Sequence, residues 1–170
     1  MDVLSHSNQR CLEAAEGWLM LGLPASALEE LEGMDGSARR APAVQELEWQ
    51  VRAAAEDWAG AWRLAQAMVE QSPRRPFGWI HRAYALRRMP GGSLEQAWEI
   101  LRPAADRFPR NFLIPYNLAC YAAQLQRPDE AWDWLQKSVR LGGVRRIRAL
   151  ALADEDLEPL RRRIEALPSQ

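Results

Sequence analysis

The fold of this chain is decided by four segments that align with one another without gaps: PASALEEL (24–31), WAGAWRLA (58–65), LEQAWEIL (94–101) and PDEAWDWL (128–135). Each segment has alanine at its fourth position, and these alanines are separated by 34, 36 and 34 residues. A large apolar residue follows each alanine, and the residue four positions after the alanine is Leu, Ala, Leu and Leu in turn. A period near 34 with small and then large apolar positions is typical of stacked helix-turn-helix units.

A longer turn explains the interval of 36 residues between Ala61 and Ala97. The turn Pro90–Ser93 is two residues longer than its counterpart before Pro128. Such an insertion leaves the packed faces in register, which explains why the period returns to 34. The repeated alanine lets two antiparallel helices approach closely, and the large residue after it fills the groove to the next pair. We therefore predict that Trp62, Trp98 and Trp132 are core residues and not a stacking platform.

The pattern predicts an all-α chain in which each helix pair buries its apolar face against its neighbours. The expected helices are 8–21 and 24–34, 43–56 and 58–71, 77–89 and 94–107, and 112–125 and 128–141. Pro24 and Pro128 are expected in the first turns of second helices, whereas Pro42, Pro73 and Pro109 are expected to end second helices.

The C-terminal part departs from the repeat. After the helix stop Gly142-Gly143, the segment 144–152 looks like half of a fifth repeat, and Asp154 is expected to open a last helix. This tail is predicted to cover the exposed face of the fourth pair. We therefore expect one domain over 1–170, with repeats at about 8–41, 42–75, 76–111 and 112–143 and a cap at 144–170.

These residues resemble the tetratricopeptide repeat (TPR) family, whose pattern is Trp-x2-Leu-Gly-x2-Tyr, then Ala-x3-Phe, then Pro. The second-helix part matches at Ala27/Leu31, Ala97/Leu101 and Ala131/Leu135, and the closing Pro matches at Pro73 and Pro109. In the third repeat, Trp79, Ala83 and Leu86 take the Trp, Gly and Tyr positions. The resemblance covers about residues 8–141 and points to a bacterial TPR-like protein. It implies a right-handed α–α superhelical solenoid of about four hairpins with C-terminal capping helices.

The same resemblance implies a protein–protein interaction module or scaffold that holds a peptide or protein segment in its concave groove and catalyses no reaction. First helices line that groove in TPR-like arrays. The implied groove residues are His81, Tyr84, Arg87 and Arg88 in the third repeat, Tyr116, Asn117, Cys120 and Gln124 in the fourth, and Glu46 and Gln50 in the second. Polar and aromatic groups of this kind suit a peptide, whose backbone they can hydrogen-bond and whose side chains they can cover. In the second repeat, the first helix around Leu47 and Val51 is shifted by about one residue relative to the family pattern. The sequence therefore does not decide which of its side chains face the groove.

Charge is distributed unevenly along the chain. Residues 1–71 carry five arginines against twelve acids, which gives −7, and residues 72–170 carry sixteen arginines and Lys137 against eleven acids, which gives +6. The ordinary explanation is solvated helix faces of chance composition, and the alternative is a basic half that attracts a partner with an acidic segment. A clamp for a C-terminal carboxylate, as in some TPR domains, is matched only in part, because Leu12 and Glu16 stand where its lysines would be. Nucleic acid is not favoured, because acids interleave with the arginines of 145–163.

The sequence offers no recognisable reaction centre or cofactor motif. His6 and His81 are the only histidines, and neither HExxH nor CxxC occurs, so no metal site is expected. Cys11 and Cys120 are expected to be buried or half-buried free thiols, and a Cys120–His81 dyad would have nothing visible to orient the histidine. We expect neither an enzyme nor a cofactor.

Two other functions remain open from the sequence. One is a small dedicated chaperone, as in the TPR-like chaperones of bacterial secretion systems, and the other is a self-associating protein whose end helices pair into a homodimer. No apolar run is long enough to cross a membrane, and residues 1–6 lack the layout of a secretory signal, which makes a cytoplasmic protein the default expectation.

Overall fold

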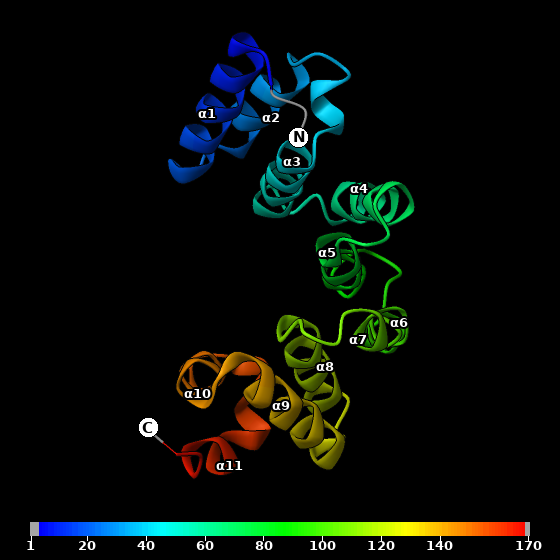
Figure 1. The fold of residues 1–170 in the computed structure, drawn as a ribbon, viewed down its shortest axis with the longest axis vertical. Coiled ribbons are helices and arrows are strands. Elements are labelled where there is room, and N and C mark those ends of the chain that lie inside the picture. Colours follow the sequence, from blue (N-terminus) through cyan, green and yellow to red (C-terminus); the bar gives the residue numbers. More distant parts are fainter. Residues whose placement is uncertain (1–3, 169–170) are drawn as a thin grey trace.

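The computed structural model describes residues 4–168, and every regular element in this part of the chain is helical (Figure 1). Helix pairs follow one another along the chain. They are α1 (His6–Met20) and α2 (Pro24–Glu32), α3 (Pro42–Ala54) and α4 (Trp58–Gln71), α5 (Pro76–Leu86) with α6 (Leu94–Leu101) and α7 (Ala104–Arg107), and α8 (Leu113–Gln124) and α9 (Pro128–Gly142). A cap follows, made of α10 (Val144–Leu152), the 3₁₀ helix η2 (Glu155–Leu160) and α11 (Arg161–Glu165). The expected all-α fold of helix hairpins is confirmed.

The repeated alanines pack as the period predicts. Ala27, Ala61, Ala97 and Ala131 are all completely buried, and so are the residues four positions after them. Helix axes come close only over small residues, and these buried methyl groups let the two helices of a pair approach each other. The same contact therefore recurs in every pair and fixes its geometry.

The turn inside each pair also repeats. A residue with positive φ follows the first helix at Gly22 (73°), Glu56 (56°), Gly91 (79°) and Gln126 (59°). At three of these turns the two residues after the helix end donate backbone hydrogen bonds back to its last turn, as from Leu23 N to Trp18 O and from Gly22 N to Leu19 O. This is the Schellman arrangement, which satisfies carbonyls left free at a helix end. The longer third turn replaces it with the Gly91–Gly92 pair.

Two expectations about prolines were wrong. Pro42 does not end a second helix but stands at the first position of α3, where its missing N–H costs nothing. The helix expected over 94–107 is interrupted between α6 and α7 at Arg102–Pro103. Pro103 has no N–H to bond the preceding turn, and its ring clashes with that turn's carbonyl, so the helix cannot run through it. The last helix is also shorter than expected, because η2 is a 3₁₀ segment that contains Pro159.

The tryptophans after the repeated alanines are half-buried and not core residues, which corrects the prediction. Trp62, Trp98 and Trp132 lie against the edge of the core, at seams between pairs that stay partly open to solvent. Guanidinium groups cover two of these rings, with Arg127 at 5.6 Å from Trp98 and Arg163 at 4.7 Å from Trp132. A cation over an indole face is favourable while its charge remains hydrated.

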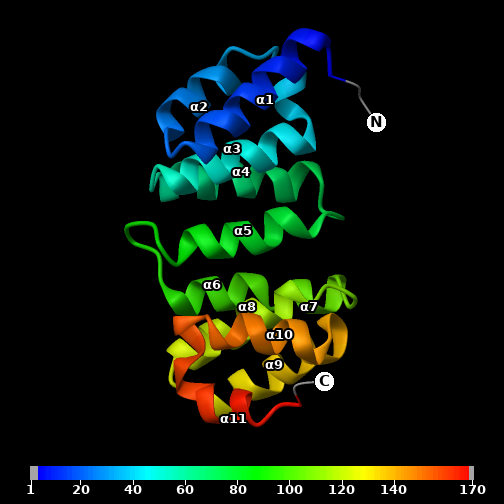
Figure 2. The same ribbon diagram turned by 90° about the vertical axis from the view of Figure 1, so that its left-hand side faces the viewer.

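The stacked pairs curve into an arch, with α4, α6 and α7 on its outer side and α3 and α5 on its inner side (Figure 1). Seen from the inner side, α10 crosses in front of α8 and α9 (Figure 2). The cap therefore lies over the concave side of the fourth pair, with α10 packed on α9 and η2 packed on α8. No helix within residues 4–168 is long and apolar enough to cross a membrane.

Candidate functional site

The concave side of the fourth repeat is already occupied by the cap. The hydroxyl of Tyr116 donates to Asp154 Oδ2 at 2.9 Å, and the Cys120 thiol lies 3.5 Å from the same oxygen. One turn further along α8, Gln124 Nε2 donates to the Asp156 carbonyl at 2.9 Å. Three of the four groove residues expected in this repeat thus hold the start of η2, and Tyr116 and Cys120 are buried.

Arg87 completes the attachment of the cap. Its Nη1 and Nη2 donate to the two carboxylate oxygens of Asp156 at 2.6 and 3.0 Å, which is the parallel fork that guanidinium and carboxylate groups favour. The side chains are 15% and 26% exposed, and the guanidinium also lies 5.2 Å from the ring of Tyr121. Burial lowers the pKa of Arg87, but the bond and charge of Asp156 outweigh it and the net pKa rises. Arg87 therefore joins the third repeat to the cap.

Burial also makes the hydroxyl and thiol beneath the cap unreactive. Burial and the nearby acids of the cap raise the pKa of Tyr116 and of Cys120. Both groups remain protonated near neutral pH and act as donors to Asp154. The Cys120 thiol faces that acid, while His81 has other partners, so the structure does not bring the two together as a dyad.

The histidine of the third repeat is part of an aromatic cluster between α3 and α5. His81 stacks on Phe77, with ring centroids 3.7 Å apart, and meets Trp49 edge-on at 4.3 Å. Its Nδ1 lies 3.0 Å from the Phe77 carbonyl, and because a carbonyl only accepts, Nδ1 carries the proton. Burial lowers the pKa of His81, so the ring is neutral near pH 7.

Trp49 is the inner-face residue that sequence reasoning missed. The predicted Gln50 is exposed on α3 and takes no part in the cluster, and Glu46 pairs with Arg75 at 2.6 Å. Trp49 is instead only 5% exposed and contacts the rings of Phe77, His81 and Tyr84. The one-residue shift suspected for this helix was the signal that could have found it.

Arg88 and Tyr84 are groove residues whose side chains stay partly exposed and form no hydrogen bond to the described residues of the cap. The Arg88 guanidinium lies 3.6 Å from the centroid of the Tyr84 ring and 5.4 Å from that of Trp58. Burial lowers the pKa of Arg88, and a guanidinium still stays charged at any physiological pH. In the described part of the chain it makes no ion pair within 4.0 Å. Arg88 Nη1 also donates to the Tyr84 carbonyl at 3.3 Å. Arg88 is therefore a half-buried cation held by two aromatic faces and one backbone carbonyl, without a carboxylate partner in the described chain.

These side chains border a hollow of about 560 Å³ between α5, α8 and the cap. It is lined by Tyr84, Arg87, Arg88, Leu113, Tyr116, Asn117, Cys120, Leu150, Ala153, Asp154, Glu155 and Asp156. Leu113 and Leu150 are 39% and 43% exposed on its walls. Asn117 donates Nδ2 to the Leu113 carbonyl at 2.8 Å, which leaves its side-chain oxygen as an acceptor. The hollow thus combines one unpaired cation, an amide oxygen and two apolar walls.

Cys120, Asp154 and Asp156 also come close enough to ligate a metal ion, with ligand atoms within 4.8 Å of one another. Their hydrogen bonds explain this proximity without one. Asp154 accepts from Tyr116, from Cys120 and from the Asp156 backbone N–H, while both carboxylate oxygens of Asp156 bind Arg87. An ion would have to displace these donors, so the group is explained as the attachment of the cap.

Comparison with known proteins supports the fold. No family model and no curated protein matches the sequence. Among solved structures, a thermophilic TPR protein of Thermus thermophilus is similar at 22% identity and a TM-score of 0.70, over 90% of this chain and 84% of that one. The MamA RS-1 ArsTM double mutant is similar at 13% identity and a TM-score of 0.64, over 96% of this chain and 93% of that one. At these identities the likeness concerns architecture alone. The chain has the fold of the tetratricopeptide-repeat proteins.

Proposed function

We propose that this chain is a binding module that holds a segment of another protein in its concave groove and catalyses no reaction. The partner segment binds in the hollow between α5, α8 and the cap. The observation that carries this proposal is Arg88, a half-buried cation without an ion-pair partner in the described chain, beside two exposed leucines. An exposed apolar patch next to an unpaired charge is typical of a surface that a partner covers.

The chemistry of the hollow favours one kind of segment. A carboxylate can pair with Arg88, and an apolar side chain beside it can pack between Leu113 and Leu150. A run of acids fits less well, because Asp154, Glu155 and Asp156 line the same hollow and would repel it. We therefore expect a single carboxylate, from a side chain or a chain terminus, next to an apolar residue.

The test locates the partner first and measures its affinity second. A photo-crosslinking amino acid at Asn117 or Leu150 of the full chain should capture one protein, whereas the same label at the exposed Glu99 of α6, on the outer side, should not. The crosslinked segment, made as a peptide, should bind an Arg88→Gln variant at least about tenfold more weakly, because a desolvated charge would lose its partner. The exposed Arg102→Gln is the matched control and should bind normally. Equal capture from Glu99, or unchanged affinity with Arg88→Gln, would contradict the proposal.

A further inference from the structure

The large apolar side chains that remain exposed are confined to two regions of the described chain. Four lie at the end of α1 and in the turn after it, and three lie between residues 113 and 150. They are Trp18, Met20, Leu21 and Leu23 in the first region and Leu113, Leu141 and Leu150 in the second. Between residues 24 and 112 none is exposed. Single exposed apolar residues are ordinary, but such clustering marks contact surfaces.

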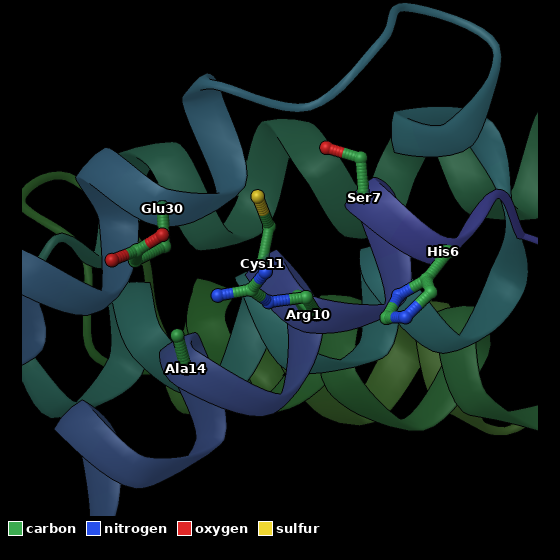
Figure 3. A pocket seen from close by; sticks show the side chains of 6 residues that line it. All are labelled: His6, Ser7, Arg10, Cys11, Ala14 and Glu30. Atoms are coloured by element: carbon green, nitrogen blue, oxygen red, sulfur yellow. The ribbon is translucent and has the colours of Figure 1, made fainter.

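The first region forms an apolar corner beside two glutamates of α2, Glu29 and Glu30. Met20 and Leu21 are 88% and 70% exposed, and Trp18 Nε1 donates to Glu30 at 3.4 Å. Trp18, Glu29 and Cys11 line a shallow hollow between α1 and α2. Cys11 also lines a neighbouring hollow, together with Ala14, Arg10 and Glu30 (Figure 3). Five glutamates against one arginine lie between residues 6 and 32, and none of these glutamates makes an ion pair within the described chain. We call Trp18, Met20, Leu21, Leu23 and Glu30 the acidic corner.

The second region includes an apolar depression surrounded by arginines. It lies at the junction of α9 and α10, has a volume of about 570 Å³ and is lined by Gly142, Gly143, Val144, Arg145, Arg146 and Ala149. The exposed Leu141 stands beside it in sequence. All five charged residues from 134 to 153 are basic. Arg145 and Arg146 are exposed, and neither makes an ion pair within the described chain. We call Leu141, Val144, Arg145, Arg146 and Ala149 the basic end.

We propose that the acidic corner of one copy of this chain docks on the basic end of a second copy. Both surfaces present apolar side chains of similar kind, and their charges are of opposite sign and unpaired within the described chain. Complementary charge steers two such patches together and disfavours like-to-like pairing. This contact is independent of the groove, because neither surface contains Arg88 or Leu113.

The position of the two surfaces determines the kind of assembly. The first pair and the cap stand at opposite ends of the long axis (Figure 2). One copy therefore uses its acidic corner and its basic end at the same time, toward two different neighbours. A heterologous contact of this kind continues into an open chain of copies and does not close as a symmetric dimer. Two surfaces of only a few side chains each predict weak association that increases with concentration and decreases with salt.

Two variants separate the surfaces. Met20→Asp with Leu21→Asp disables the acidic corner, and Arg145→Glu with Arg146→Glu disables the basic end. All four side chains are exposed, so the fold should be retained, and circular dichroism verifies this. Controls are Ala43→Asp with Ala54→Asp, which adds the same two acids, and Arg74→Glu with Arg110→Glu, which makes the same charge reversal, all at exposed positions outside both surfaces.

Sedimentation velocity over a range of concentrations gives the result. The unmodified chain and both controls should associate, and each disabling variant should weaken association by about tenfold or more. An equimolar mixture of the two disabled variants should form a dimer and nothing larger, because one intact corner and one intact end remain. A monomeric unmodified chain, a mixture that stays monomeric, or a disabled variant that associates with itself as strongly as the unmodified chain would each overturn the proposal. In the last case the contact would be isologous.

Discussion

The fork between Arg87 and Asp156 should determine how firmly the cap holds to the array. The two residues lie 69 positions apart in the sequence, and their pairing ties η2 to α5 across the face of α8. We expect Arg87→Met to loosen the cap because it keeps the apolar stem against Tyr121 but removes the charge. Asp156→Asn keeps the shape of the partner and also removes its charge. The double variant completes a thermodynamic cycle that isolates the interaction.

The burial of the pair determines the expected magnitude. Exposed ion pairs contribute about 0–1 kcal/mol, and breaking a fully buried pair costs about 3–5 kcal/mol. At 15% and 26% exposure, with two charge-assisted hydrogen bonds, this pair lies between these limits. Hydrogen bonds to charged groups contribute about 1.5–3 kcal/mol. We therefore expect a coupling energy of about 2 kcal/mol, with each single variant destabilised by about the same amount.

Urea unfolding followed by circular dichroism measures the four proteins of the cycle. Arg161 and Glu158 provide an exposed control pair in the same cap. Arg161 Nε donates to both carboxylate oxygens of Glu158, at 2.8 and 3.0 Å, and the two side chains are 45% and 62% exposed. Their cycle should give no measurable coupling. A coupling of Arg87 with Asp156 below about 0.5 kcal/mol, in the range of exposed pairs, would refute the view that the fork attaches the cap.

Three further predictions concern the packing, the turns and the pH dependence of the array. A Cβ at Gly78 would lie 3.1 to 3.2 Å from atoms of α4, whereas one at Gly17 would meet nothing within 4 Å. Gly17→Ala should therefore raise the free energy of unfolding by about 0.5–1 kcal/mol. The change caused by Gly78→Ala should be less favourable than this by at least about 1 kcal/mol. Equal gains for the two variants in urea unfolding would disprove the close approach at Gly78. Positive φ is costly for residues other than glycine. In the same assay, Gln126→Gly should raise the free energy of unfolding by about 0.5 kcal/mol and Gly22→Ala should lower it by about 1 kcal/mol. Changes of the opposite sign would contradict the repeated turn. Burial lowers the pKa of His81 below 6.5, so the unfolded chain binds that proton first as the pH falls. Stability should be constant above about pH 7 and fall from about 6.5 toward the folded-state pKa, and His81→Gln should remove this slope.

Local sequence was sufficient for the helices, the pairing and most of the core. Ala27, Ala61, Ala97 and Ala131 recur at helical-repeat spacing, and their complete burial follows from the contact that each must make inside its own pair. Such contacts join residues close in sequence, and a period reports them directly. The breaks were also readable, since Pro103 interrupts a helix by its own covalent structure. The expected helix over 94–107 nevertheless ran through Pro103, and Pro42 was expected to end a helix but begins α3.

Only the tertiary structure decided what the concave side presents. The sequence placed Tyr116, Cys120 and Gln124 in an open groove, but the cap folds back and takes their hydrogen bonds. One signal was present, because α8 is apolar on nearly all sides, and such a helix must be covered all round. What covers it could not be read, since the contacts with Asp154 and Asp156 join residues more than 30 positions apart, and no local period encodes them. The burial of Tyr116 and Cys120, the ion pair of Arg87 with Asp156 and the surface that stays open around Arg88 all follow from that long-range packing.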